Sequence, residues 1–166
     1  MITIGFIGTG LMGLPMAKNI LKSGFKLKAF NRSIEKAEPL KEFGAEISKS
    51  ISDVVKDSDF VITMLTDDSA VDAITSSTEF LDNLKSGSIV IDMSSVKPTT
   101  ATKHGIYLKS KNVNYLDAPV SGGTVGAEDA SLAIMVGGDQ NVFDNSVNIL
   151  KAMGNPTLVG PIGSGQ

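Results

Sequence analysis

A glycine-rich turn near the amino end constrains the fold more than any other feature of the chain. The motif Gly8-Thr9-Gly10-Leu11-Met12-Gly13 follows the apolar segment 2–7, and a helical pattern of apolar residues follows the motif. The first glycine permits a tight turn, the second lets phosphates approach the backbone, and the third lets the helix pack close to the strand. The helix N-terminus adds free N–H groups and partial positive charge, which favour an anion. A strand, this turn and a helix together predict a site for the pyrophosphate of a dinucleotide.

Strand-like apolar segments alternate with helical patterns along most of the sequence. The predicted strands are Thr3–Ile7, Lys26–Phe30, Ala45–Ile47, Phe60–Leu65, Ser88–Asp92, Val113–Asp117, Leu132–Val136 and Pro156–Val159. The predicted helices are Leu11–Ser23, Ser33–Phe43, Ser52–Asp57, Asp68–Ser76, Pro98–Lys109 and Asn141–Met153. Such alternation implies βαβ units, so we expect an α/β fold with a doubly wound, mostly parallel sheet, the Rossmann architecture.

Single residues mark several helix boundaries. Gly24 follows the first predicted helix as a C-terminal glycine, Ser33 precedes the second as an N-cap, and Pro98 stands at a first helical position. Pro39 is expected to break or bend the second helix.

The composition excludes several kinds of site and partner. The chain has 166 residues, a formal net charge of −3, no cysteine and a single histidine. Disulfides and thiolate chemistry are therefore excluded, no metal site is expected, and His104, flanked by Lys103 and Gly105, is expected on a solvated helix face. No basic run suggests nucleic acid, no apolar run approaches the ~18 residues that span a bilayer, and no signal peptide is evident. We expect a cytoplasmic protein.

The last residues differ from the rest in composition. Residues 1–160 are expected to form one dinucleotide-binding domain, whereas 161–166 read Pro-Ile-Gly-Ser-Gly-Gln, a glycine-rich stretch. Such a stretch is either a frayed tail or a connector. We favour a connector.

The residues after the second predicted strand bear on the choice of cofactor. NAD-binding sheets of this kind place an acidic residue about 20 positions after the glycines, where it binds the ribose 2′-hydroxyl. Here the sequence is Asn31-Arg32-Ser33, without a carboxylate. Arg32 can pair with a 2′-phosphate and stack on adenine. We therefore predict NADP(H), with NAD(H) as the second choice.

Two later segments place hydroxyl groups and glycines after strands. Ser94 and Ser95 end a strand where a cofactor ring would lie. Ser121-Gly122-Gly123 follows another strand and presents consecutive backbone N–H groups that suit a carboxylate, although the same sequence also suits a plain glycine turn.

Taken together, these motifs resemble the β-hydroxyacid dehydrogenase family, also called the 3-hydroxyisobutyrate dehydrogenase family. The resemblance covers essentially the whole chain through segments 8–19, 31–33, 64–68, 91–95, 117–123 and 135–138. The Asn-Arg-Ser sequence is similar to the NADP-using branch, which includes glyoxylate and succinic semialdehyde reductases.

The resemblance implies a role for each matching residue. The pyrophosphate would be held by Gly8, Thr9, Gly10, Leu11, Met12 and Gly13, and the adenosine phosphate by Asn31, Arg32 and Ser33. Met64 and Leu65 would line the cofactor, and Ser95 would lie near the nicotinamide ribose in place of the usual threonine. Ser121, Gly122 and Gly123 would bind the substrate carboxylate. Ala130 stands where the family often has glycine.

The implied activity is reversible hydride transfer between nicotinamide and a small hydroxy acid, aldehyde or keto acid that bears a carboxylate. Family members continue beyond the segment that matches Gly163–Gln166 to a catalytic lysine and a helical domain that usually forms the oligomer. No catalytic residue is therefore expected in this chain, which should bind cofactor and turn over little. A flavin site and a non-enzymatic nucleotide-binding scaffold or sensor remain as alternatives.

Overall fold

A single nine-stranded sheet organises the molecule, and the computed structural model describes residues 1–166. The strands are β1 (Thr3–Ile7), β2 (Lys26–Phe30), β3 (Glu46–Ile47), β4 (Phe60–Thr63), β5 (Ile89–Asp92), β6 (Asn114–Asp117), β7 (Val120–Ser121), β8 (Leu132–Gly137) and β9 (Gly154–Gly160). The order β3-β2-β1-β4-β5-β6 is parallel throughout. β8 then pairs antiparallel with β6 and β7 and parallel with β9. The predicted doubly wound, mostly parallel sheet is confirmed.

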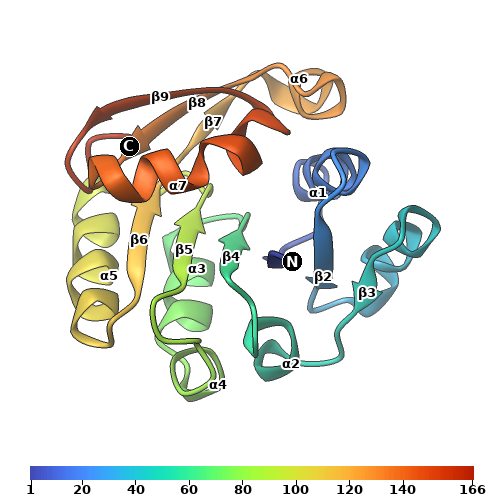
Figure 1. Cartoon of the computed structure of the whole chain (residues 1–166), viewed down its shortest axis with the longest axis horizontal. Helices are drawn as coiled ribbons and strands as arrows, with labels where there is room; N and C mark the ends of the chain where they lie inside the picture. Colours follow the sequence, from blue (N-terminus) through green and yellow to red (C-terminus); the bar gives the residue numbers. More distant parts are fainter.

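Helices cover both faces of this sheet (Figure 1). They are α1 (Gly13–Lys22), the 3₁₀ helices η1 (Ile34–Lys36) and η2 (Glu38–Phe43), α2 (Ile51–Val55), α3 (Asp68–Thr75), α4 (Thr78–Leu81), α5 (Pro98–Ser110), α6 (Gly123–Asp129) and α7 (Gln140–Lys151). One buried cluster joins α1, η2, α6 and α7 to one face, and a second joins α2, α3, α4 and α5 to the other. No helix here has both the length and the apolar character needed to cross a membrane.

The strand order fixes where a ligand can approach. From β1 the chain winds outward through β2 to β3, and then returns to β4 on the other side of β1. The connections after β1 and β4 therefore leave in opposite directions, which opens a crevice beyond the carboxyl ends of these two strands. The glycine motif lies at this crevice because it directly follows β1.

Several predicted boundaries need correction. The predicted helix Ser33–Phe43 is two short 3₁₀ helices, and Pro39 lies in the first turn of the second. Ser33 occupies the N-cap position of η1 without a capping hydrogen bond from its side chain. The predicted strand Phe60–Leu65 ends at Thr63, so that Met64 and Leu65 lie in the loop that follows it.

The sequence patterns also missed three short elements, α4, α6 and β7. α4 and β7 contain four and two residues, which is too short for an apolar period to be visible, and α6 has two glycines among its seven residues, which disfavour a helix. β9 is longer than predicted and includes Pro156, which is tolerated because β9 is an edge strand that pairs only with β8.

Candidate functional site

The turn after β1 presents unpaired backbone N–H groups at the mouth of the crevice. The amides of Gly10, Leu11, Met12 and Gly13 donate no hydrogen bond within the chain. No side chain caps α1, and its first turn has no acidic residue that would occupy or repel an anion. This arrangement suits a phosphate group.

The three motif glycines have different surroundings. A Cβ at Gly8 would collide with the carbonyl oxygen of Met64, and one at Gly13 would collide with the carbonyl oxygen of Gly8. A Cβ at Gly10 would meet nothing within 4 Å. Gly8 and Gly13 therefore allow close packing inside the protein, whereas Gly10 faces the open space that a ligand would fill.

Asn31 ties the glycine turn to the end of β2. Its Oδ1 accepts a hydrogen bond from the Thr9 amide at 2.9 Å, and its Nδ2 donates to the Ser33 carbonyl at 3.0 Å. The Gly8 amide also donates to the Phe30 carbonyl at 2.9 Å. Asn31 thus positions the turn, a role that the phosphate-binding interpretation of the sequence did not include.

Arg32 lies next to this link with an exposed side chain and no hydrogen bond or ion pair. Ser33 follows it and is partly exposed. A groove of about 680 Å³ starts at Gly10 and Leu11, runs along α1 and is also lined by Lys36 and Thr124. Lys36 is a cation beside the glycine turn that the sequence analysis did not single out, although its place three residues after Ser33 was visible.

The loops after β4 and β5 are joined by a side-chain hydrogen bond. Ser94 is fully buried, and its Oγ accepts from the Leu65 amide at 2.8 Å. Ser95 is exposed, and its hydroxyl makes no hydrogen bond within the protein. Of the two serines that the sequence placed near a cofactor ring, only Ser95 is accessible to a ligand.

Ser121, Gly122 and Gly123 are exposed where β7 leads into α6. Gly122 and Gly123 have φ angles of 141° and 62°, which glycine adopts readily. The amides of Gly123, Thr124 and Val125 donate no hydrogen bond within the chain. The segment therefore offers free donors.

Two buried carboxyl groups, whose roles the sequence patterns did not predict, support this edge of the sheet. Asp92 and Asp117 are Cα partners at the ends of β5 and β6. Asp92 Oδ1 accepts from Thr63 Oγ1 at 2.9 Å and from the Ser94 amide at 3.1 Å. Burial raises the pKa of both carboxyls, although hydrogen bonds from backbone amides act in the opposite direction.

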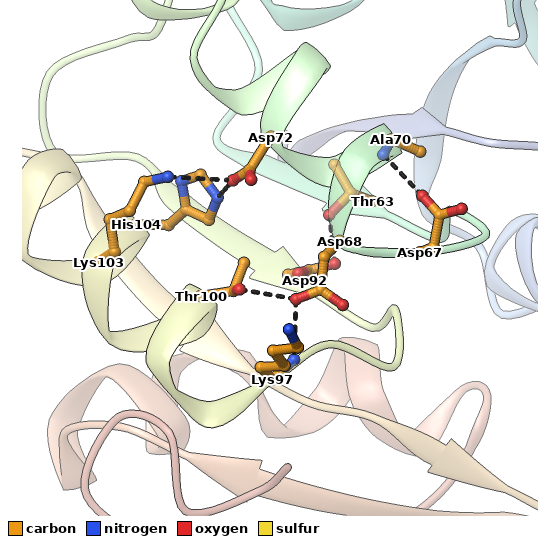
Figure 2. A network of polar contacts seen from close by, with 10 residues as sticks. All are labelled: Thr63, Asp67, Asp68, Ala70, Asp72, Asp92, Lys97, Thr100, Lys103 and His104. Atoms are coloured by element: carbon orange, nitrogen blue, oxygen red, sulfur yellow. Dashed lines mark hydrogen bonds and ion pairs between the residues drawn. The ribbon is translucent and has the colours of Figure 1, made fainter.

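The expectation for His104 is wrong. His104 is only 3% exposed, because it shares the inner face of α5 with Ala101 and Leu108. Its Nε2 lies 2.7 Å from Oδ1 of Asp72 on α3 (Figure 2). The spacing of Ala101, His104 and Leu108 by three and four residues was the signal that placed this histidine on the buried side.

Figure 2 also shows that Asp68, at the start of α3, contacts the first turn of α5. Its Oδ2 accepts from the Lys97 amide at 3.0 Å and from Thr100 Oγ1 at 2.6 Å. These contacts hold the pKa of Asp68 below its usual value, with the Thr100 hydrogen bond as the largest cause. The network around His104 and Asp72 thus joins α3 to α5 as a structural support beside the site.

The residues present fit a dinucleotide with a nicotinamide group. Free amides and an open Gly10 lie at the crevice, an unpaired cation lies at Arg32, and the exposed Ser95 lies further along the same edge. These groups, from the free amides to the Ser95 hydroxyl, lie along the carboxyl ends of the strands, where this kind of sheet binds its ligands.

Comparison with known proteins agrees with this geometry. A family model described as the NAD binding domain of 6-phosphogluconate dehydrogenase matches residues 3–163. The chain is 42% identical to "Uncharacterized oxidoreductase YkwC" of Bacillus subtilis over 99% of its length and 58% of that protein. It is 38% identical to an NAD-dependent L-serine dehydrogenase of Pseudomonas aeruginosa, over 98% of its length and 55% of that protein.

A solved structure gives the same result. The 3-hydroxyisobutyrate dehydrogenase of Mycobacterium tuberculosis, studied with L-serine, superposes with a TM-score of 0.94 and 33% identity over 99% of this chain and 56% of that one. The chain spans just over half the length of the curated relatives described above. The chain belongs to the β-hydroxyacid dehydrogenase family, and its fold is that family's Rossmann-type NAD(P)-binding domain.

Proposed function

We propose that this chain is the NADP(H)-binding part of an oxidoreductase that transfers a hydride between nicotinamide and a small β-hydroxy acid or semialdehyde. The observation that carries the proposal is the set of four free amides around the open Gly10 at the crevice between β1 and β4. The pyrophosphate would be held by the free amides of Gly10, Leu11, Met12 and Gly13. Gly8 and Thr9, whose amides bond to Phe30 and Asn31, would shape the turn. Met64, Leu65 and Ser95 would line the path to the nicotinamide.

Arg32 supports NADP(H) over NAD(H). Its guanidinium follows β2, where an adenosine ribose would lie, and no acidic partner neutralises it. A 2′-phosphate would gain a charge-assisted hydrogen bond there, whereas a 2′-hydroxyl would gain little. Asn31 and Ser33 would also lie at the adenosine end of the site. Asn31 would act by accepting the hydrogen bond from the Thr9 amide, which positions the glycine turn.

Titration of the wild-type chain with NADPH and with NADH tests this choice. We expect Arg32→Ala to weaken NADPH binding by about 10- to 100-fold, because one hydrogen-bonded charge pair is lost, and to change NADH binding by less than about threefold. Isothermal titration calorimetry measures both affinities. Lys41→Ala, which removes an exposed cation already paired with Glu38 at 2.7 Å, is the matched control. Tighter binding of NADH than of NADPH, with no effect of Arg32→Ala, would contradict the preference.

The substrate is proposed to be a small acid of the 3-hydroxyisobutyrate, glyoxylate or succinic semialdehyde type. Its carboxylate would bind at Ser121, Gly122 and Gly123, where the free amides begin with that of Gly123. The cofactor would supply or accept the hydride. The residues of this chain would orient the two reactants, since positioning at near-attack distance lowers the barrier.

We propose that the proton donor for the developing alkoxide lies outside these residues. Lys18 lies over the Phe43 ring at 4.5 Å, and Lys97 is an exposed residue at the start of α5. We therefore propose that residues 1–160 are the cofactor domain and that 161–166 begin a connector to a helical domain that carries a catalytic lysine. The longer protein is proposed to be a homo-oligomer. The exposed Ser95 and the free amides near Gly123 favour an enzyme over a nucleotide-binding scaffold.

A further inference from the structure

Asp117 is buried at the end of β6, yet both of its carboxyl oxygens are used by one distant segment. Oδ1 accepts a hydrogen bond from the Gly163 amide at 2.7 Å, and Oδ2 accepts one from the Gly165 amide at 2.9 Å. The two donors lie 46 and 48 residues further along the chain. Figure 1 shows the carboxyl end of the chain returning to the end of β6.

The space around this carboxyl group is available only because glycines surround it. A Cβ at Gly137, the partner of Asp117 in β8, would collide with Asp117 Oδ1. A Cβ at Gly165 would collide with the Met135 carbonyl oxygen and would lie 2.8 Å from Asp117 Oδ2. The Asp117 carboxyl group and residues 163–166 therefore pack closely, and this packing requires glycine at positions 137 and 165.

Gln166 continues the contact toward the candidate nicotinamide site. Its Oε1 accepts from the Val96 amide at 3.0 Å, and its Nε2 donates to the Ser94 carbonyl at 3.2 Å. These two bonds lie on either side of the exposed Ser95. The segment Gly163–Gln166 is thus fastened at Asp117 and again at the loop that presents Ser95.

We propose that Asp117 is a positioning residue that fastens Gly163–Gln166 along the carboxyl edge of the sheet and, through Gln166, fixes the loop that carries Ser95. The proposal rests on the proposed function for its catalytic meaning, because that loop would contact the nicotinamide end of the cofactor. The glycine turn lies on the other side of β4, so Asp117 should not affect the seating of the pyrophosphate.

Amide hydrogen exchange followed by NMR on the 166-residue chain tests the proposal. In Asp117→Asn, one oxygen acceptor is replaced by a donor that faces an N–H group. We expect exchange to accelerate by roughly 10- to 100-fold at Gly163, Gly165 and Val96, while the amides of β4 and β5 keep their wild-type rates. Gln166→Ala should accelerate exchange at Val96 alone. NADPH affinity should stay within about threefold of wild type in both variants.

Further variants separate a positioning role from a general packing role. Gly165→Ala keeps the carboxyl group but displaces the segment, so it should accelerate exchange at the same amides as Asp117→Asn. It therefore tests the proposal even if Asp117→Asn folds poorly. Ser164→Ala, at an exposed side chain without a hydrogen bond, is the control and should leave the pattern unchanged. Exchange that rises equally in β4 and β5, or an unchanged rate at Val96 in Asp117→Asn and Gly165→Ala, would overturn the proposal. Failure of the wild-type chain to bind NADPH would instead overturn the proposed function.

Discussion

Ala130 has a backbone conformation that its side chain disfavours. It ends α6 with φ 55° and ψ 40°, in the left-handed region where a Cβ costs about 1–2 kcal/mol. Asp57 and Asn112 also have positive φ angles, but these residue types tolerate the region better. The structure therefore places the cost of this conformation at a single helix end.

Replacing Ala130 by glycine should therefore stabilise the protein. We expect Ala130→Gly to raise the free energy of unfolding by about 0.5–1 kcal/mol, because relief of strain exceeds the added freedom of the unfolded chain. Urea unfolding followed by circular dichroism measures the change. Ala127→Gly, in the same helix but with a buried methyl group, should lower the free energy of unfolding by about 1 kcal/mol or more. A loss of stability in Ala130→Gly would show that this residue is not strained.

Among the elements, the short helix α2 depends on a cation that another element supplies. α2 has five residues and no basic residue in its last turn. Lys28 of β2 is only 9% exposed, and its Nζ donates to the carbonyl oxygens of Asp53, at 2.8 Å, and Lys56. A buried lysine in a strand thus satisfies the unpaired carbonyls and the negative end of the helix dipole.

This contact predicts an unequal response of two lysines in the same strand. Lys28→Met keeps most of the side-chain volume but removes the donors, so we expect the free energy of unfolding to fall by about 1–3 kcal/mol. Lys26→Met, at the exposed first position of β2, should change it by less than about 0.5 kcal/mol. Chemical denaturation of both variants gives the comparison. Equal stabilities would mean that Lys28 does not cap α2.

For the whole molecule, the main feature is that free backbone amides and an exposed hydroxyl lie at one edge of the sheet, where the proposed function places the cofactor and the substrate. The free amides of the glycine turn, Ser95 and the amides after Gly122 all follow carboxyl ends of strands. The one histidine is buried against Asp72 and is therefore not available to a substrate. We therefore expect this chain to bind the cofactor but to catalyse the reaction slowly.

We expect the 166-residue chain to bind NADPH yet to reduce glyoxylate and succinic semialdehyde at least about 10²–10⁴-fold more slowly than a relative with a positioned general acid. NADPH oxidation followed at its nicotinamide absorbance measures the rate, and calorimetric binding on the same sample shows that the cofactor site is intact. Turnover comparable to that of such a relative would show that the proton donor lies within these residues.

The structure confirms those predictions that depend on local sequence patterns. The strand before Gly8 and the helix after Gly13 form because apolar spacing and glycine placement act within a few residues. Predictions failed where tertiary contact decided the outcome. His104 was expected on a solvated helix face, but it is 3% exposed because α5 packs against α3, where Asp72 faces it.

The sequence by itself determined the alternation of strands and helices, hence the parallel sheet, and it placed the glycine turn at a carboxyl edge. Only the tertiary structure decided the roles of Lys28, His104 and Asp117, because each depends on a partner that lies 25 to 48 residues away. A carboxyl group or an ammonium in a sequence does not show which backbone amide or carbonyl will face it. That pairing is fixed when the elements pack, since a buried polar group is stable only where a partner meets it.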